Sequence, residues 1–305
     1  MDTVCVFMST YNGERYLRPQ LDSILAQRDV AVRLLIRDDG SRDGTIDIIR
    51  EYQSRHDNIT LYQGENLGYV MSFMWLVNHC EPQEGCYYAF SDQDDVWDDG
   101  KLSEAVRLLK ELDGSGPCLY YSDLKVVDQD LNFIRRANTW EGTIDKYKFA
   151  VFIGIRGCTM VYNHALQAML YPCPVNDISG HDNYIGLVAF WLGRVVYDSN
   201  AHIHYRQTGS NLSITGTTKW NKLMKNFSYF KIRLTRRKCI HERNAKELLS
   251  HYGAAYGPEL EELRAVAEYR QSLKKRLALL FNPKFKRFSL PIRVFNDAFI
   301  LFGKL

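Results

Sequence analysis

Three carboxylates lie within four residues of the chain, at Asp92, Asp94 and Asp95, directly after the apolar stretch of residues 87–90. Like charges repel one another when they share a pocket, so a bound cation is the usual partner of such a group. Mg²⁺ and Mn²⁺ accept oxygen ligands and commonly combine one or two carboxylates with substrate phosphates. The pattern predicts a Mg²⁺ or Mn²⁺ site in which Asp94 is the preferred ligand and Asp92 the second.

The same turn has a simpler interpretation, in which it is exposed to solvent and its carboxylates cap the helix that follows. Asp95, Asp98 and Asp99 precede the helical pattern of residues 102–112, and aspartate is a favoured capping residue. Short acidic motifs often occur without a metal. The position at a strand end favours the metal site, while for Asp95 a capping role stays open.

A second acidic turn, Asp-Asp-Gly-Ser at residues 38–41, follows the buried-strand pattern of residues 32–36. Such a stretch is often no more than a turn with a helix cap. Here it would lie beside residues 9–13, the loop that follows the first predicted strand. A buried Asp39 carboxylate could there accept a hydrogen bond from the imide N–H of a pyrimidine, while Tyr11 supplies an aromatic face to the base.

Strand-length apolar stretches alternate with amphipathic helical patterns along the first 121 residues. This alternation predicts an α/β, Rossmann-like fold with a mostly parallel sheet flanked by helices. Ligands bind at the carboxyl ends of the strands in such sheets, so the polar groups that follow the strands converge on one edge. The predicted strands cover residues 3–8, 32–36, 59–62, 87–90 and 119–121, and the predicted helices cover residues 16–25, 46–52, 70–77 and 102–112.

The charge is distributed unevenly, although the net charge of the chain is only +3. Residues 219–305 carry 20 Lys and Arg against 7 Asp and Glu, whereas residues 1–218 carry 19 against 29. Hydrophobic residues make up 46% of the chain and charged residues 25%, as in globular proteins. We therefore predict two parts, a catalytic domain at 1–218 and a basic, mainly helical region at 219–305.

Seven cysteines are scattered through the chain without a Cys-x-x-Cys spacing, which favours a reduced, cytoplasmic compartment. Residues 1–8 lack the basic start of a signal peptide, and no apolar run reaches the roughly 18 residues that a membrane span requires. We expect a protein that is neither exported by that route nor integral to a membrane.

These motifs together resemble the family 2 inverting glycosyltransferases, which have a GT-A fold. The resemblance extends from residue 1 to about residue 215 and rests on four stretches in this order: residues 9–13, 38–41, 92–95 and 181–182. Residues 91–97 and 205–207 further resemble the branch of rhamnosyltransferases that builds bacterial rhamnose polysaccharides. The resemblance implies transfer of L-rhamnose from dTDP-rhamnose to a lipid-linked saccharide.

The resemblance also implies roles for individual side chains. Asp182 corresponds to the catalytic base, which accepts the proton of an acceptor hydroxyl so that the anomeric carbon is inverted in one displacement. A helix-capping role is the alternative for this residue. Contacts to the nucleotide are expected from Ser9, Thr10, Tyr11, Asn12, Glu14, Asp39, Asn66 and Asp92, contacts to the diphosphate from Asp92, Asp94 and Arg206, and metal ligation from Asp94 and Asp92 with His204 as a further candidate.

Two positions depart from the pattern of this family. Thr208 stands where related sequences often have a histidine, which puts a metal or phosphate contact from that position in doubt. His202 and His204 lie nearby, although a single histidine more often has a structural hydrogen-bonding role. His181 stands where many relatives have glutamate before the base, and this difference could affect the choice of acceptor.

The basic clusters near the carboxyl end alternate with apolar residues, for example in residues 284–288. Nucleic-acid binding is one interpretation, but the region lacks a recognisable nucleic-acid motif. The pattern also suits a helix on an anionic membrane surface. We predict peripheral attachment to the inner face of the cell membrane and no nucleic-acid partner. A helical bundle or a homodimer contact is the alternative.

Two other functions remain open at the level of the sequence. The same enzyme class could use a UDP-hexose, either galactose or N-acetylglucosamine, because an aspartate can read uracil as well as thymine. A nucleotide-binding or receiver-like signalling module also gathers acidic residues around a metal. Receiver domains are much shorter, however, and would not explain Asp182 or Arg206.

Overall fold

The computed structural model describes residues 1–112, 116–137, 144–152, 155–207, 239–286, 288 and 290–305. The chain divides into two compact units. Unit 1 comprises residues 1–143, 155–174 and 180–208, and unit 2 comprises residues 144–154, 175–179 and 209–305. The predicted boundary near residue 218 lies outside the described residues.

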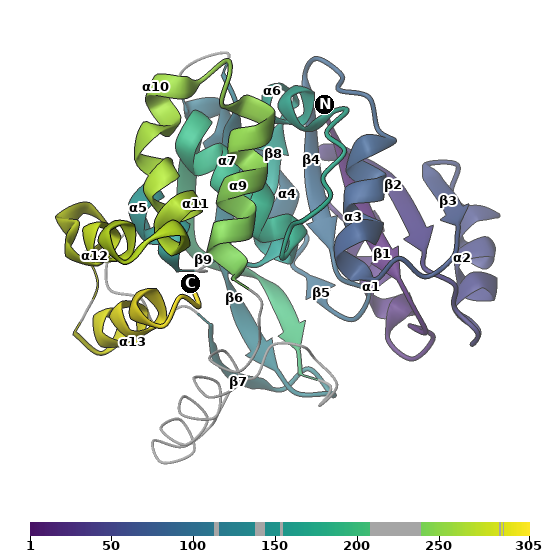
Figure 1. Cartoon of the computed structure of the whole chain (residues 1–305). Helices are drawn as coiled ribbons and strands as arrows, with labels where there is room; N and C mark the ends of the chain where they lie inside the picture. Colours follow the sequence, from purple (N-terminus) through teal and green to yellow (C-terminus); the bar gives the residue numbers. More distant parts are fainter. Residues whose placement is uncertain (113–115, 138–143, 153–154, 208–238, 287, 289) are drawn as a thin grey trace. The chain divides into compact units, whose positions relative to one another are not determined.

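The first half of unit 1 is a parallel sheet with helical connections, as the alternating pattern predicted (Figure 1). Its strands run in the order β3-β2-β1-β4, and all three pairings are parallel. The strands are β1 (Asp2–Thr10), β2 (Val30–Asp38), β3 (Ile59–Gln63) and β4 (Cys86–Ser91), and the helices are α1 (Leu17–Leu25), α2 (Thr45–Gln53) and α3 (Tyr69–Asn78).

Beyond β4 the sheet becomes mixed. It continues in the order β4-β8-β6-β9-β5, with β7 on β6; β6 and β9 are parallel, whereas the other pairings there are antiparallel. This half contains β5 (Val96–Trp97), α4 (Lys101–Glu111), β6 (Cys118–Val127), β7 (Phe133–Arg136), the 3₁₀ turn η1 (Gly157–Thr159), β8 (Val161–Asn163), α6 (His164–Leu170), α7 (His181–Leu192) and β9 (Arg194–Arg206).

The core of unit 1 forms where α1 covers the centre of the sheet. Strand β1 is buried on both faces, so it has a continuous apolar stretch instead of an alternating one. Leu17, Leu21 and Ile24 of α1 are fully buried and belong to the same core cluster as Val6 and Met8 of β1. Each such side chain contributes about 1.5–3 kcal/mol on burial. This packing fixes the carboxyl ends of β1, β2 and β4, from which the polar loops emerge.

The regular elements among the described residues of unit 2 are all helices, in agreement with the predicted helical region. Its helix α5 is capped by Asp145, whose carboxylate accepts hydrogen bonds from the main chain of Tyr147 and Lys148. The other elements are α9 (Ile240–Tyr252), α10 (Gly257–Leu260), η2 (Glu261–Leu263), α11 (Arg264–Glu268), η3 (Tyr269–Gln271), α12 (Leu273–Phe281), η4 (Pro283–Lys286) and α13 (Leu290–Leu301), with α5 at Lys146–Val151.

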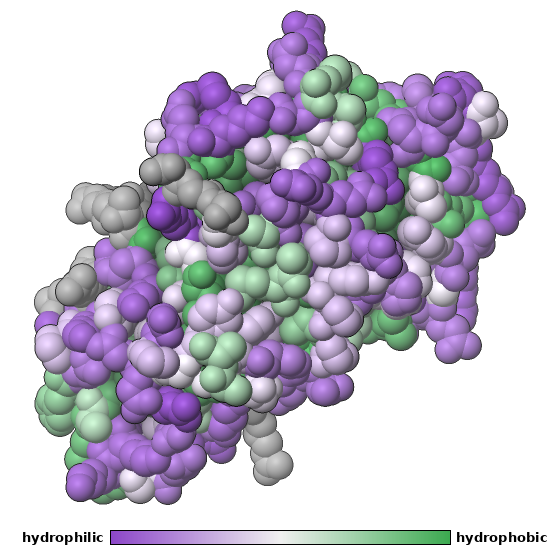
Figure 2. Space-filling model, turned by 90° about the horizontal axis from the view of Figure 1, so that it is seen from above, coloured by the Kyte–Doolittle hydropathy of each residue, from purple (hydrophilic) through white to green (hydrophobic). Residues whose placement is uncertain are grey.

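The cysteines, the length of the helices and the surface fit the expectations from the sequence. All seven cysteines are free and buried. Among the described helices, none is both long enough and apolar enough to cross a bilayer. On the face drawn in Figure 2, hydrophilic residues predominate, and apolar side chains form patches between them.

Candidate active site

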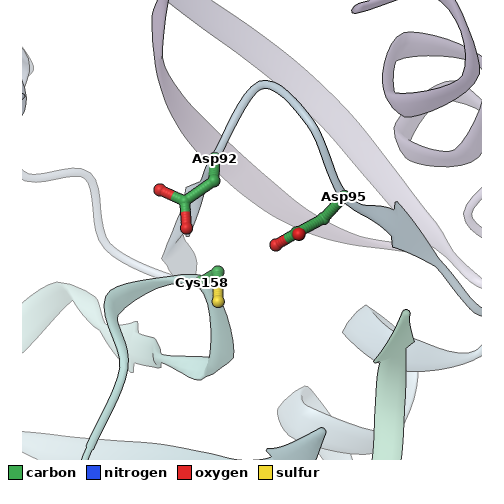
Figure 3. Close-up of side chains that lie close together, drawn as sticks. All are labelled: Asp92, Asp95 and Cys158. Atoms are coloured by element: carbon green, nitrogen blue, oxygen red, sulfur yellow. The ribbon is translucent and has the colours of Figure 1, made fainter. Parts of the chain in front are cut away.

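The acidic turn between β4 and β5 brings two carboxylates against a thiol. Ligand atoms of Asp92, Asp95 and Cys158 all lie within 4.8 Å of one another, and Cys158 comes from η1, far away in the sequence (Figure 3). Asp95 is fully buried. One of its oxygens accepts a hydrogen bond from the Arg206 main chain at 3.1 Å, while Oδ2 has no hydrogen-bond partner.

The capping interpretation of the turn is not what the structure shows. Helix α4 begins after Gly100, and no side chain caps its first turn. Asp95 points toward Cys158 instead, whereas Asp98 pairs with Lys125 and Asp99 pairs with Arg28. The buried carboxylate of Asp95 is therefore available to the group around Asp92.

None of the three carboxylates of the turn forms an ion pair among the described residues, and the charges of Arg156 and Arg206 offset theirs only in part. Burial, together with the nearby Asp94 and Asp182, raises the pKa of Asp92 to about 7. Burial also raises the pKa values of Asp94 and Asp95. Carboxylate oxygens that are buried, crowded and partly without donors are the ligands that Mg²⁺ and Mn²⁺ prefer. Asp92 and Asp95 fit a divalent cation as oxygen donors, whereas Asp94, the preferred ligand from the sequence, is not part of the group that the described residues form. Ligation by Asp94 stays a prediction.

A buried lysine lies beneath this turn, which the sequence did not single out. Lys101 is fully buried, and its ammonium group lies 3.5 Å from the ring centroid of Trp97 without a hydrogen-bond partner. Burial lowers the pKa of Lys101 to about 7, while the charges of Cys158 and Asp95 act in the opposite direction. The sequence contains no sign of this site, because a lysine at the start of a helix is usually exposed to solvent.

Arg206 connects the end of β9 to the acidic turn. Its Nε donates to the main-chain oxygen of Asp94 at 2.9 Å, and another guanidinium nitrogen donates to the oxygen of Gln129. The guanidinium carbon lies 4.7 Å from the ring centroid of Tyr16. The structure thus places this predicted diphosphate residue at the turn that carries Asp94.

The loops after β1 and β2 are joined by hydrogen bonds between predicted nucleotide residues and the second acidic turn. Thr10 Oγ1 donates to Asp38 at 2.8 Å, and the Asn12 main chain donates to Ser41 Oγ at 2.9 Å. Glu14 accepts a hydrogen bond from the Gly44 main chain at 2.9 Å. The side chains predicted to surround the nucleotide therefore lie at one sheet edge.

Asp39 has three hydrogen-bond donors, in contrast to the carboxylates of the first acidic turn. Its two oxygens accept hydrogen bonds from the main chain of Leu67 and Gly68, each at 2.8 Å, and it pairs with the buried Arg37. Asn66 accepts a hydrogen bond from the same Gly68 amide. A carboxylate has about four acceptor sites, so one is left for a base. The reading of a base by Asp39 stays a prediction.

Gln93 joins the acidic turn to the nucleotide loop. Its Oε1 accepts a hydrogen bond from the Tyr11 amide at 2.9 Å, and its Nε2 donates to the Tyr11 oxygen at 3.0 Å. A Cβ atom at Gly13 would lie 2.3 Å from Gln93 Oε1, so a larger residue there would displace the Gln93 side chain. The sequence analysis gave Gln93 no role, because only the neighbouring carboxylates have a side chain that suggests metal or phosphate binding.

Asp182 lies in the first turn of α7, close to the acidic turn. The helix begins after Gly180 without a side-chain cap, and one Asp182 oxygen accepts a hydrogen bond from the Asn183 amide at 2.7 Å. The negative charge of Asp182 contributes to the raised pKa values of Asp92 and Tyr69. The predicted base, the predicted diphosphate residue and Tyr69 therefore lie within electrostatic reach of one another.

Tyr69 and His181 lie near the predicted base Asp182; the sequence analysis assigned no role to Tyr69 and connected His181 with the choice of acceptor. Tyr69 begins α3 and is half exposed. His181 is buried against Phe73, at a ring separation of 4.2 Å, and neither ring nitrogen has a hydrogen-bond partner. Burial lowers the pKa of His181, so the ring is neutral near pH 7. A Cβ atom at Gly157 would lie 2.5 Å from this ring, which shows how tightly it is packed.

The other histidine candidates lie apart from the group of Asp92, Asp95 and Cys158. His204 Nε2 lies 2.9 Å from Asp98 Oδ1 and 3.5 Å from Lys125 Nζ. His202 lies 2.9 Å from Asp198. Neither ring belongs to the group of possible ligands that the described residues form. Thr208 lies outside the described residues.

Comparison with known proteins decides the family. The family model described as glycosyl transferase family 2 matches residues 5–168. The chain belongs to glycosyltransferase family 2. A dTDP-rhamnosyl transferase of Shigella flexneri, RfbG, is 36% identical over 105 residues, which are 33% of this chain and 36% of that protein. An uncharacterised glycosyltransferase of Nostoc sp. is 29% identical over 221 residues, 68% of this chain and 66% of its own length.

Solved structures show the same fold for this glycosyltransferase. S. aureus TarS in complex with UDP-GlcNAc superimposes with a TM-score of 0.55 at 15% identity, covering 99% of this chain and 89% of that one. The mannosyltransferase PcManGT from Pyrobaculum calidifontis, in complex with GDP-Man and Mn²⁺, superimposes with a TM-score of 0.50 at 16% identity, covering 98% and 85%. The predicted GT-A fold is confirmed.

Proposed function

We propose that this enzyme transfers L-rhamnose from dTDP-rhamnose to a lipid-linked saccharide, with inversion, during bacterial cell-surface polysaccharide synthesis. Support for the donor comes from the stretch that is 36% identical to a dTDP-rhamnosyl transferase. The observation that carries the proposal is the convergence of Asp182 with Asp92 and Asp94, whose charges together raise the pKa of Asp92. A base beside a diphosphate site is the arrangement that a single displacement requires.

Each side chain has a defined part in this reaction. Asp182 accepts the proton of the attacking hydroxyl, which general-base catalysis requires within hydrogen-bond reach. The hydroxyl oxygen bonds to the anomeric carbon as the bond to the diphosphate breaks on the opposite face. Asp94 and Asp92 would hold a Mg²⁺ or Mn²⁺ ion, which supplies positive charge for the leaving diphosphate. Gln93 holds the nucleotide loop against the turn.

A donor panel tests this proposal most directly. The purified chain is titrated by calorimetry with dTDP-rhamnose, UDP-galactose and UDP-N-acetylglucosamine in the presence of Mn²⁺, and slow hydrolysis of each donor without acceptor is followed in parallel. We expect the tightest binding and hydrolysis with dTDP-rhamnose. Preference for a UDP-hexose would reassign the donor. Phosphoryl uptake from a small phosphodonor, without any donor hydrolysis, would favour the receiver-like module instead.

We also propose that unit 2 attaches the enzyme to an anionic membrane surface, in the cytoplasm. Helix α13 buries Phe299 and Ile300 but exposes Val294, and the exposed Leu301 follows Val294 by two helical turns. Helix α12 likewise exposes Leu273 and Phe281, eight residues apart. Basic residues flank these apolar positions at Lys274, Lys284, Arg293 and Lys304. Apolar side chains bordered by basic ones suit the boundary between acyl chains and anionic headgroups.

Vesicle sedimentation tests this attachment. The double variant Phe281→Ser/Phe302→Ser removes two side chains that are 69% and 65% exposed. We expect it to lose binding to vesicles of phosphatidylglycerol and phosphatidylcholine, while Tyr256→Ser, an exposed aromatic of the same unit, retains it. Unchanged binding would contradict the proposal. Loss of self-association without any vesicle binding would instead assign the surface to a homodimer.

A further inference from the structure

We propose that Arg135 and Arg156 form a subsite for a phosphate group of the acceptor, next to the acidic turn. This inference rests on the proposed function, because a lipid-linked saccharide carries such a group at its linkage. Neither arginine was given a role from the sequence. The evidence comes from strand register, ring contacts and the distribution of charge within unit 1.

The strand register places Arg135 and Tyr205 on one face of the sheet. Arg135 of β7 pairs with Val126 of β6, and Val126 pairs with Tyr205 of β9. Side chains of directly paired residues project from the same face. Since neighbouring strands are about 4.8 Å apart, the main chains of Arg135 and Tyr205 stand roughly 10 Å apart across the buried Val126.

Arg156 reaches the same face from another segment. It immediately precedes η1, and its guanidinium carbon lies 5.7 Å from the ring centroid of Tyr205. Burial and the neighbouring charge of Arg156 both lower the pKa of Arg135. Two guanidinium groups, from segments about 20 residues apart in the sequence, thus lie near each other over Tyr205.

Neither guanidinium has a carboxylate partner among the described residues. Arg135 donates only to the main-chain oxygen of Arg136, at 2.8 Å, and Arg156 has no ion pair there. Arg136, on the opposite face of the same strand, does pair with Asp123 at 2.9 Å. The charges of Asp123 and Asp92 act on the arginines of the subsite without forming a direct ion pair with them. Guanidinium groups bind phosphate through paired hydrogen bonds. An anion would satisfy both arginines.

The location favours the acceptor over the donor as the source of this anion. Cys158, two residues after Arg156, faces Asp92 and Asp95, so the pair lies beside the reaction centre. Apart from Asp92, the predicted nucleotide residues instead follow β1, β2 and β3, at the other part of the sheet order. Arg206 and the carboxylates of the turn already serve the donor diphosphate. The phosphate group of the acceptor is therefore the anion that we assign to Arg135 and Arg156.

Anion binding with the donor site filled tests the proposal. Inorganic phosphate is titrated by calorimetry into the full chain saturated with dTDP and Mg²⁺, and dTDP affinity is measured separately. Arg135→Gln and Arg156→Gln should each weaken phosphate binding about tenfold or more, the loss expected for a paired charge-assisted contact, with dTDP affinity unchanged. Arg50→Gln, an exposed arginine of α2 without an ion pair among the described residues, is the matched control.

Each outcome decides the matter. Unchanged phosphate binding in both folded variants, checked by their melting temperatures, would overturn the subsite. Equal weakening of dTDP would assign the arginines to the donor and overturn the acceptor assignment. Hydrolysis of dTDP-rhamnose by the variants, measured without acceptor, separates this test from the proposed function. If the unaltered enzyme hydrolysed no nucleotide-sugar, the proposed function would fail while phosphate binding could persist.

Discussion

The two acidic turns of this enzyme contain the same residue type at equivalent strand ends, yet their carboxylates have opposite environments. Asp39 accepts hydrogen bonds from two main-chain amides and pairs with Arg37. Asp95 has an oxygen without a partner, and the pKa of Asp92 is raised to about 7. The first turn stabilises the fold, whereas the second retains uncompensated charge for a ligand. The same substitution, aspartate to asparagine, should therefore change the stability of the protein differently in the two turns.

The largest expected effect concerns the base that faces the second turn. Asp182→Asn should lower turnover by about 10² to 10⁴, because general-base catalysis is lost. Donor affinity should stay the same, since the contact proposed for Asp182 is with the acceptor hydroxyl. Single-turnover kinetics and dTDP-rhamnose titration measure the two quantities. Turnover close to that of the unaltered enzyme would refute the role of Asp182.

Asp39→Asn should destabilise the protein strongly. The substitution keeps the shape of the side chain but leaves Arg37 buried without its partner, and breaking a buried ion pair typically costs about 3–5 kcal/mol. The free energy of unfolding is measured by urea denaturation. The matched variant Asp92→Asn removes repulsion and should not destabilise the metal-free protein. Equal losses in both variants would remove the distinction between the turns.

Asp94→Ala should abolish the response of donor binding to Mn²⁺. The carboxylate is the preferred ligand of the predicted ion, and a hard cation depends on such oxygen donors. Titration of the nucleotide at increasing Mn²⁺ concentrations gives the response, with Asp43→Ala on the nucleotide side as a control. If the response persisted, the ligand role would pass to Asp92 or Asp95.

The second turn should also give the metal-free protein a pH signature. Asp92 has a pKa of about 7 when folded, and an unfolded aspartate has about 3.9. Between these values the folded chain binds more protons than the unfolded chain, so stability falls as the pH rises. Thermal melts between pH 4.5 and 7.5 in EDTA should show a smaller decline for Asp92→Asn. An identical decline in both proteins would contradict the assignment.

The smallest effect is expected at the link between the turns. Gln93→Ala removes two hydrogen bonds to the Tyr11 main chain, and each contributes about 0.5–1.5 kcal/mol. We expect dTDP affinity to fall by roughly tenfold, and stability to fall by less than in Asp39→Asn. Calorimetry gives the affinity, and Gln53→Ala on α2 is a control outside the site. A loss of stability equal to that of Asp39→Asn would assign Gln93 to the fold instead.

The sequence predicted secondary structure best where an element is long enough to show a hydrophobic period. Strands β1 to β4 and helices α1 to α4 follow the predicted ranges, because each has enough residues to show a period. Strands β5, β7 and β8 have only two to four residues, too few for a period. Strands β5 and β8 also pair with strands far away in the sequence. The prediction of a mostly parallel sheet therefore describes the first half better than the second.

The same limit applies within the site. Asp92, Asp94 and Asp182 could be named from motifs, since those carboxylates are spaced together or precede an apolar helix. Lys101, Cys158 and Arg156 could not, because each is an ordinary residue until the chain folds. Cys158 joins the acidic turn only through η1, and Arg156 meets Arg135 only through the register of β6, β7 and β9.

The sequence by itself determined the α/β architecture, the family resemblance and the carboxylates that could act on a nucleotide-sugar. Only the tertiary structure decided which carboxylates have donors. Those donors come from distant segments: Leu67 and Gly68 precede α3, and Arg206 ends β9. Hydrogen bonds act over about 3 Å, so their partners depend on packing and not on spacing along the chain. For that reason the two acidic turns look alike in the sequence and differ in the fold.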